Sequence, residues 1–327
     1  MMKVRGFITH KKAETYEDCQ DYFAINKDKG RLAISDGMSQ SIFPQWWAEE
    51  LVRAYVYDDW VPDQNDLDKL RENWLKRVHE FLESQKQSGK PTWMLENCLI
   101  EKRGAGATFC GVRLKNESEW EGYILGDSCL MNVDKNNRIV KIERTGEEIF
   151  NNNPDYFDSL IGGKGIVKII HGTAEEGTKL LLVTDALAEF LHSKIGRESD
   201  YVHRLLQIEN HNAFCSLIDE WRASEDLHND DTTLVIIEYD GSECLEVSFK
   251  DDLVDLCNTD KNTEKVDGET NVADGVFSKK KRPAIRWIEE AMKSAEKIKN
   301  FSVNLYNRLI DQLQQMMEQI TNPKRNG

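Results

Sequence analysis

Aspartates stand at the ends of short apolar runs in this chain, where solubility does not require a charge. Asp36 closes the run RLAIS, Asp185 closes KLLLVT, and Asp230 opens TTLVIIEY. Asp127 follows GYIL, and Asp21 precedes another strand-like run. Each aspartate taken alone is more simply explained as a turn residue. Together at one end of a sheet, carboxylates repel one another unless a cation neutralises them, and oxygen-only ligands favour Mg²⁺ or Mn²⁺.

The apolar runs beside these aspartates predict strands, and longer amphipathic stretches predict helices. Strands are expected at 31–35, 108–114, 120–125, 179–184 and 232–239. Helices are expected at 44–60, 66–87, 186–193 and 199–223. Strands also follow one another in pairs, at 108–125 and 120–133, which favours antiparallel hairpins over alternating strands and helices.

The composition changes after the last of these strands. Residues 258–283 contain almost no core-forming side chains and are typical of a flexible linker. From Ile285 to Ile320 apolar residues recur at steps of three and four, which predicts one amphipathic helix at 284–321. We therefore expect a globular domain at 1–257, a linker, and a C-terminal helix that binds a partner or self-associates.

Bulk properties exclude several classes of protein. The net charge of −15 argues against nucleic acid as a partner, because backbone binding depends on Lys and Arg neutralising phosphates. No apolar run is long enough for a signal peptide or a membrane span, so no membrane partner is expected. Seven scattered cysteines without a CxxC pair suggest a reducing, cytoplasmic location.

Five ordered segments carry a resemblance to a known family. They are EDCQDYF at 17–23, AISDGM at 33–38, GAGAT at 104–108, LGDS at 125–128, and LLVTDAL at 181–187 with DDTTLV at 230–235. Over residues 5–240 the chain resembles the PPM (PP2C-type) Ser/Thr protein phosphatases, as a divergent, bacterial-like member. The resemblance implies an α+β fold, an α-β-β-α sandwich of two antiparallel sheets flanked by helices, to which the C-terminal helix is an addition.

The resemblance also implies a metal centre. Asp36 would bridge two Mg²⁺ or Mn²⁺ ions, the Gly37 carbonyl would add a ligand, and Asp185 and Asp230 would complete the first ion. Asp127 would hold a third, weaker ion. Asp21 would bind through metal-bound water. Acting through a metal-activated water, Asp36, Asp185 and Asp230 would be the catalytic residues for direct attack on phosphoserine or phosphothreonine in a phosphoprotein, and a partner would be the opposing protein kinase.

Two positions in or beside the acidic N-terminal motif depart from that family, and a nearby glutamate bears on one of them. Gln20 replaces a Glu, so the second ion has a weaker ligand there. Glu17 lies four residues before Asp21 and would share its side of a strand, where it supplies the missing carboxylate or is simply solvated. Tyr16 stands where many members have an Arg that grips phosphate.

Further departures concern the substrate phosphate and the leaving group. Lys11 or Lys12 could replace the missing Arg, or the two could form an ordinary solvated pair. Met38 stands where a His is usual, so the general acid has no candidate. Ala186 follows Asp185 in place of Gly, which requires a backbone conformation open to a Cβ atom. Gln20, Tyr16 and Met38 favour the alternative function, a pseudophosphatase that serves as a scaffold or binding module with weak or no catalysis. A phosphatase acting on small phosphoesters is a third possibility.

Overall fold

Two stacked sheets form the centre of the fold in the computed structural model, which describes residues 2–146, 150, 153–194, 196–240, 244–247 and 249–254. The first sheet has the order β14 (Cys244–Val247), β1 (Lys3–Thr9), β13 (Thr232–Glu238), β12 (Lys179–Val183), β7 (Cys129–Val133) and β8 (Ile139–Glu143). The second has the order β11 (Lys168–Thr173), β6 (Glu119–Leu125), β5 (Phe109–Leu114), β3 (Arg31–Asp36) and β2 (Asp21–Asn26). A small third sheet contains β10 (Gly163–Lys164), β9 (Tyr156–Asp158) and β4 (Gly106–Ala107).

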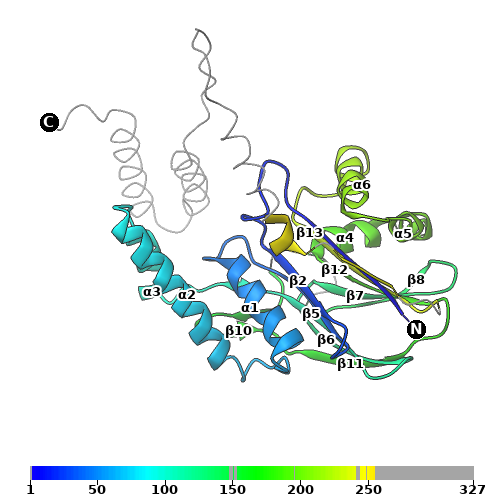
Figure 1. Ribbon diagram of the computed structural model, residues 1–327, viewed down its shortest axis with the longest axis horizontal. Helices are drawn as coiled ribbons and strands as arrows, with labels where there is room; N and C mark the ends of the chain where they lie inside the picture. Colours follow the sequence, from blue (N-terminus) through cyan, green and yellow to red (C-terminus); the bar gives the residue numbers. More distant parts are fainter. Residues whose placement is uncertain are drawn as a thin grey trace, which may run out of the picture. The chain divides into compact units, whose positions relative to one another are not determined.

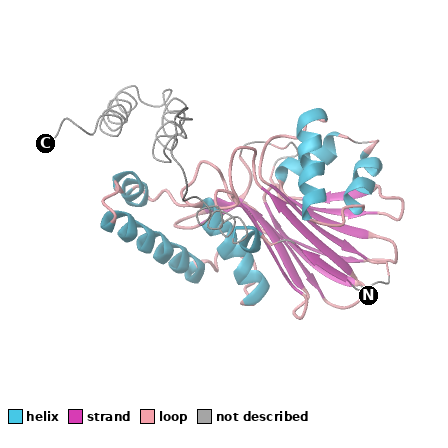
Figure 2. Cartoon of the chain, turned by 45° about the horizontal axis from the view of Figure 1, so that its top comes forward, coloured by secondary structure: helices cyan, strands magenta, loops and turns pink. Residues whose placement is uncertain are grey.

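Helices cover the outer face of each large sheet (Figures 1 and 2). The helices α4 (Asp185–Ser193), α5 (Glu198–Leu206) and α6 (His211–Ser224) pack on the first sheet. The helix α1 (Pro44–Tyr57) packs on the second, α2 (Asp68–Gln87) packs against α1, and residues of α3 (Trp93–Ile100) contact the same apolar cluster. The α-β-β-α sandwich that the sequence resemblance implies is therefore confirmed.

Alternation along the strands explains these layers. In β13, Leu234 and Ile236 join the apolar cluster beneath α4, α5 and α6, whereas Val235 and Ile237 join the cluster between the two sheets. Successive side chains of a strand point to opposite faces, so a strand that is covered on both faces is apolar throughout. The continuous run TTLVIIE is thus explained by its place in the middle of a covered sheet.

The predicted elements agree with the structure except in two places. The expected single helix at 199–223 is wrong, because the chain breaks between α5 and α6. There Ile208 is buried in the core, and the Asn210 side chain accepts a hydrogen bond of 3.0 Å from the Ala213 amide to begin α6. The expected hairpin at 120–133 is also wrong. At Gly126 (φ +97°) the chain turns between β6 and β7, which lie in different sheets.

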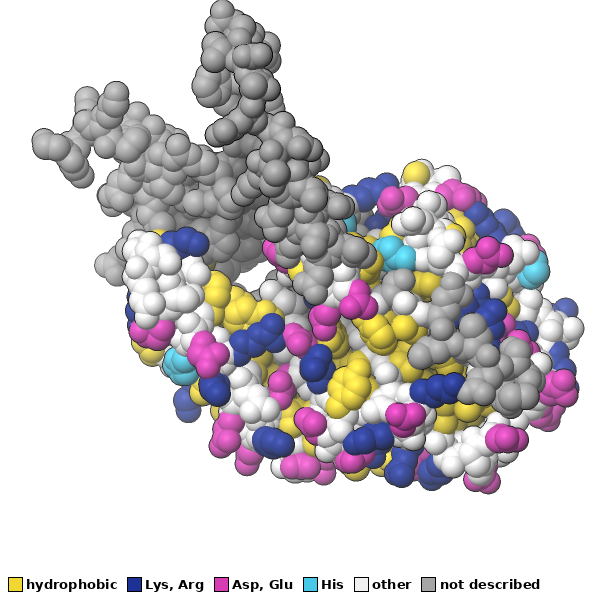
Figure 3. Space-filling view, viewed as in Figure 1, with side chains coloured by type: hydrophobic (Ala, Val, Ile, Leu, Met, Phe, Trp, Pro, Cys, Tyr) yellow, Lys and Arg dark blue, Asp and Glu magenta, His cyan; other side chains and the backbone are white. Residues whose placement is uncertain are grey.

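The predicted linker at 258–283 and the predicted helix at 284–321 lie outside the described residues. Among the helices that the structure does describe, none has both the length and the apolar content to span a membrane. On the face drawn in Figure 3, Lys and Arg side chains are interspersed with Asp and Glu.

Candidate metal centre

The second sheet brings two of the predicted aspartates together at one end. Asp21 opens β2 and Asp36 closes β3, and the two residues are direct partners in the antiparallel ladder. The end of β6, where Leu125 pairs with Phe109 of β5, lies at the same edge. Asp127 follows two residues later. Three of the aspartates are therefore placed by the register of one sheet.

The first sheet supplies the others from the opposite layer. Val183, at the end of β12, pairs with Leu234 near the start of β13 and with Cys129 at the start of β7. Asp185 begins α4 directly after β12, and Asp230 lies two residues before β13. The first turn of a helix favours a carboxylate, because the backbone N–H groups there lack partners within the helix.

The GAGAT segment holds the turn that carries Asp36. The Thr108 amide donates to the Asp36 carbonyl at 2.9 Å, and the Met38 amide donates to the Gly106 carbonyl at 2.9 Å. Gly37 is required by close packing, since a Cβ atom there would lie 2.8 Å from the backbone of Pro44. The side chain of Met38 lies against Gly106, whose added Cβ atom would meet its sulfur.

Burial and mutual repulsion oppose ionisation of these carboxyl groups. Burial, and then the charge of Asp185, raises the pKa of Asp36 well above its ordinary value. Burial, and then the charge of Asp127, raises the pKa of Asp185 in the same way. Burial raises the pKa of Asp21 to about 7, with a contribution from Asp231. It raises the pKa of Asp127 to about 6. A cation bound among these groups would reverse the shifts.

The side chains present fit a hard divalent cation in their chemistry. Oδ1 of Asp21 and Oδ1 of Asp127 are buried and have no hydrogen-bond partner among the described residues. The other oxygen of Asp21 accepts hydrogen bonds from the hydroxyls of Thr184 at 2.9 Å and Thr233 at 2.7 Å, which fixes its orientation. Within the described ranges, no group of three or more His, Cys, Asp or Glu side chains lies close enough to hold a metal ion as the side chains stand. The fit is therefore one of ligand type and charge, without preformed coordination.

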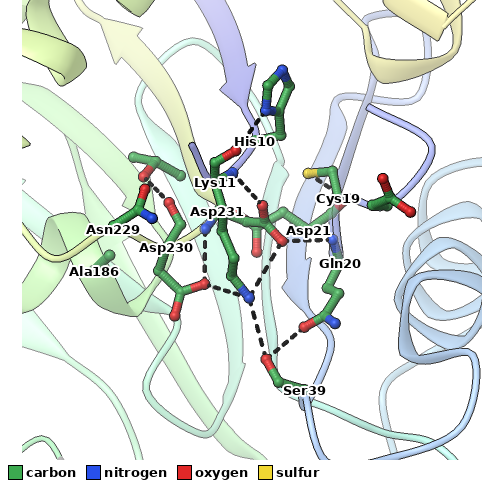
Figure 4. A network of polar contacts seen from close by, with 12 residues as sticks. His10, Lys11, Cys19, Gln20, Asp21, Ser39, Ala186, Asn229, Asp230 and Asp231 are labelled. Carbon is green, nitrogen blue, oxygen red and sulfur yellow. Dashed lines mark hydrogen bonds and ion pairs between the residues drawn. The ribbon is translucent and has the colours of Figure 1, made fainter. Parts of the chain in front are cut away.

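A lysine ammonium lies among the carboxylates (Figure 4). Nζ of Lys11 lies 2.9 Å from Oδ1 of Asp230 and 3.9 Å from Oδ2 of Asp231, and it donates to Oγ of Ser39 at 3.3 Å. Burial lowers the pKa of Lys11, but the charges of Asp231 and Asp230 outweigh it and raise the pKa above its ordinary value. The interpretation of Lys11 as a solvated surface residue is therefore wrong. Lys12 fits that interpretation, with a side chain that is 50% exposed.

Two other predicted residues lie away from the carboxylates. Glu17 is exposed in a turn before β2, so the argument that it shares a strand face with Asp21 is wrong. The turn forms because the Thr15 hydroxyl donates to Asp18 at 2.9 Å and the Asp18 amide donates to the Thr15 carbonyl at 3.0 Å. The Tyr16 hydroxyl lies 2.7 Å from Nε2 of His211 on α6, which makes Tyr16 part of the packing there.

Gln20 and Ala186 remain at the site. The Gln20 carbonyl accepts a hydrogen bond of 3.2 Å from the Gly37 amide, and its side-chain Oε1 accepts one of 2.6 Å from Ser39. Ala186 lies in α4, and its φ is not positive, so a Cβ atom is tolerated there. The replacement of Gly by Ala after Asp185 therefore leaves the backbone unstrained.

Sequence reasoning missed Asp231 and Lys250. Asp231 is 2% exposed and accepts hydrogen bonds from the amides of Lys11 at 2.9 Å and Gln20 at 2.8 Å. It thereby ties the loop before β2 to β13. The doublet Asp230-Asp231 was a usable signal, because adjacent residues entering a strand point to opposite faces.

Residues after β14 also contact the loop that precedes β2. Nζ of Lys250, a residue 7% exposed, donates to the carbonyls of Cys19 and Asp21. The rings of Phe249 and Phe23 stack at 5.4 Å, and the Tyr22 hydroxyl donates to Asp251 at 2.9 Å. A short segment beyond the sandwich therefore supports the start of β2, and no sequence motif pointed to it.

No family model and no curated protein matches this sequence. Solved structures similar to it include the photosystem II phosphatase PBCP, at 14% identity and a TM-score of 0.49 over 73% of this chain and 98% of that one. They also include the S. agalactiae serine/threonine phosphatase, at 15% identity and a TM-score of 0.46 over 73% and 99%. A third is the catalytic domain of the phosphatase PstP in complex with two manganese ions, at 14% identity and a TM-score of 0.43 over 72% and 97%. By its own layer order and its aspartates at the strand ends, the chain has the α-β-β-α fold of the PPM (PP2C-type) phosphatases.

Proposed function

We propose that this chain is a metal-dependent phosphoprotein phosphatase that hydrolyses phosphoserine or phosphothreonine. The observation that carries the proposal is the convergence of Asp36, Asp185, Asp21 and Asp127 from both sheets, each with a raised pKa. Such a set is unfavourable for a purely structural role, since uncompensated buried charge destabilises a fold. It is suited to a divalent cation and a phosphoryl group.

Each residue has a defined part in this proposal. Asp36 follows Leu32 and Ile34 on the face of β3 that points between the two sheets, and it would be a ligand together with the Gly37 carbonyl next to it. Asp185 and Asp230 would complete the ligands from the first sheet, and Asp127 would offer its buried Oδ1. Mg²⁺ or Mn²⁺, when bound, supplies Lewis-acid stabilisation of phosphoryl charge and lowers the pKa of the attacking water. Asp21, whose orientation is fixed by the hydroxyls of Thr184 and Thr233, would orient a water molecule beside the other carboxylates.

A pseudophosphatase scaffold is the second candidate, favoured by two specific observations. Tyr16 is bound to His211, so its position presents no cation to a substrate phosphate. Met38 packs on Gly106, and no titratable side chain takes the place of a general acid at that position. Both observations concern substrate binding and leaving-group protonation, whereas the carboxylates themselves are intact.

Turnover of p-nitrophenyl phosphate and of a phosphothreonine peptide in millimolar Mn²⁺, with and without chelator, separates the two candidates. We expect turnover that EDTA abolishes and added Mn²⁺ restores, because the carboxylates alone provide no Lewis acid to activate the attacking water and to stabilise the phosphoryl charge. A folded protein without turnover in Mn²⁺ or Mg²⁺ would establish the scaffold. Faster turnover of small metabolite phosphoesters than of phosphopeptides would assign the site to small substrates.

We further propose that residues 284–321 bind a protein partner, such as the opposing kinase, or a second copy of the chain. Deletion of 258–327 keeps Phe249, Lys250 and Asp251, so we expect unchanged p-nitrophenyl phosphate turnover and an altered sedimentation coefficient or loss of partner capture. The matched deletion of 249–327 removes the Lys250 contacts and is expected to lower the midpoint of thermal unfolding. If deletion of 258–327 alone made the protein insoluble or inactive, the C-terminal region would belong to the catalytic unit.

A further inference from the structure

Lys11 is anchored at both ends against the carboxylates. Its amide donates to Oδ1 of Asp231 at 2.9 Å, and its ammonium lies 2.9 Å from Oδ1 of Asp230. The side chain is only 15% exposed. A long, flexible lysine side chain loses considerable rotamer entropy when it is held in one position. The contacts with Asp230 and Asp231 must offset that loss, which indicates an electrostatic role for the ammonium.

The Lys11 ammonium is surrounded by oxygen atoms, which are also the ligands of a divalent metal ion. The ammonium faces the oxygens of Asp230, Asp231 and Ser39, and Ser39 donates in turn to Gln20 at 2.6 Å. On this side of the site the two carboxylates have Lys11 as a counter-ion, and Gln20 is neutral. On the other side, Asp36 closes β3 and Asp185 begins α4, and Oδ1 of Asp127 is buried without a hydrogen-bond partner among the described residues.

We propose that Lys11 is a built-in cation that takes the place of one divalent ion, so that the native chain binds a single Mn²⁺ at Asp36, Asp185 and their neighbours. This inference rests on the proposed metal centre and specifies its stoichiometry. A second divalent ion near Asp230 would lie close to a fixed ammonium, and like charges a few ångströms apart in a partly buried site repel strongly. Removing the ammonium takes away the cation nearest to Asp230 and Asp231, leaves Arg222 to act on them from farther away, and opens that side to a second ion.

The experiment counts Mn²⁺ bound to the full chain at pH 7.5 without substrate, by electron paramagnetic resonance of free Mn²⁺ and by calorimetry. We expect one equivalent for the native chain and a second equivalent, or at least tenfold tighter binding, for Lys11→Gln. Lys11→Arg keeps the charge and is expected to keep one equivalent. Lys12→Gln, a neutralisation at the adjacent exposed position, is the matched control and is expected to behave as the native chain does.

Several results would overturn the inference. One is two equivalents in the native chain with no change in Lys11→Gln, and another is no Mn²⁺ bound by either protein. A higher KM for phosphopeptide in Lys11→Gln, with an unchanged Mn²⁺ count, would make Lys11 a phosphate-binding residue instead. The count is independent of turnover, so a gain of Mn²⁺ in Lys11→Gln without activity in either protein would support this inference while contradicting the proposed phosphatase function.

Discussion

Asp36→Asn is expected to lower Mn²⁺-dependent turnover about 10³-fold or more, a loss of roughly 4 kcal/mol of transition-state stabilisation. In the proposed metal centre, the charge of Asp36 is needed to hold the cation. The same substitution is expected to stabilise the metal-free protein by about 1–2 kcal/mol, because it removes a charge that burial and Asp185 both oppose. Turnover with Mn²⁺ and urea unfolding in EDTA measure the two effects.

The opposite signs of these effects make the prediction specific. Damage to the fold would lower turnover and stability together, whereas loss of a metal ligand lowers turnover and relieves repulsion. Asp28→Asn, in the exposed turn between β2 and β3, is the matched control and should change neither quantity. Retention of native turnover by Asp36→Asn would place the metal centre elsewhere in the chain.

The second large effect is a fall in the stability of the metal-free protein as pH rises from about 4 to about 7. Burial raises the pKa of Asp21 from 3.8 to about 7, so over this interval the folded state holds a proton that the unfolded state has lost. The free energy of unfolding then decreases with pH, and the stabilising contribution is complete only below the unfolded pKa. For Asp21 alone the change amounts to at most about 4 kcal/mol. Asp127, with a pKa of about 6, adds to it.

Urea unfolding in EDTA at several pH values tests this dependence, with the slope of Asp21→Asn subtracted from that of the native chain. The amide of Asn can still accept from Thr184 and Thr233, so the substitution removes the titration with little change of packing. Asp28→Asn should keep the native slope. Millimolar Mn²⁺ at pH 7.5 is expected to restore stability, because a ligand that binds only the folded state stabilises it. Equal slopes for the native chain and Asp21→Asn would refute the assignment.

The five strands expected from apolar runs match β3, β5, β6, β12 and β13, because such runs are local patterns, whereas the short strands β8 to β11 were not predicted. A continuous apolar run such as that before Asp185 identifies a covered strand, and a charge at its end marks the rim of the sheet. The split between α5 and α6 was harder to predict, because Ile208 continues the apolar pattern while Asn210 starts a new helix. The apolar periodicity alone does not show whether one helix continues through Ile208 or a new helix begins at Asn210.

The features of the site that the sequence did not predict depend on contacts between residues far apart in the chain. The contact of Lys11 with Asp230 joins residues about 220 positions apart, and a Lys pair in a polar loop has the composition of an ordinary surface. The hydrogen bonds of Lys250 to the start of β2 join residues separated by 229 or more positions. Such contacts depend on how the two layers and the loops pack, which is a property of the assembled fold.

The position of β1 determines when this protein can fold during synthesis. Both neighbours of β1 in the sheet, β13 and β14, are translated more than 220 residues after β1 itself. Pairing over such sequence distances is slow, and exposed strand edges meanwhile favour aggregation. Asp21 and Asp36 are likewise translated long before Asp230. The pairing of β1 and the gathering of these aspartates can therefore occur only after β13 has been translated.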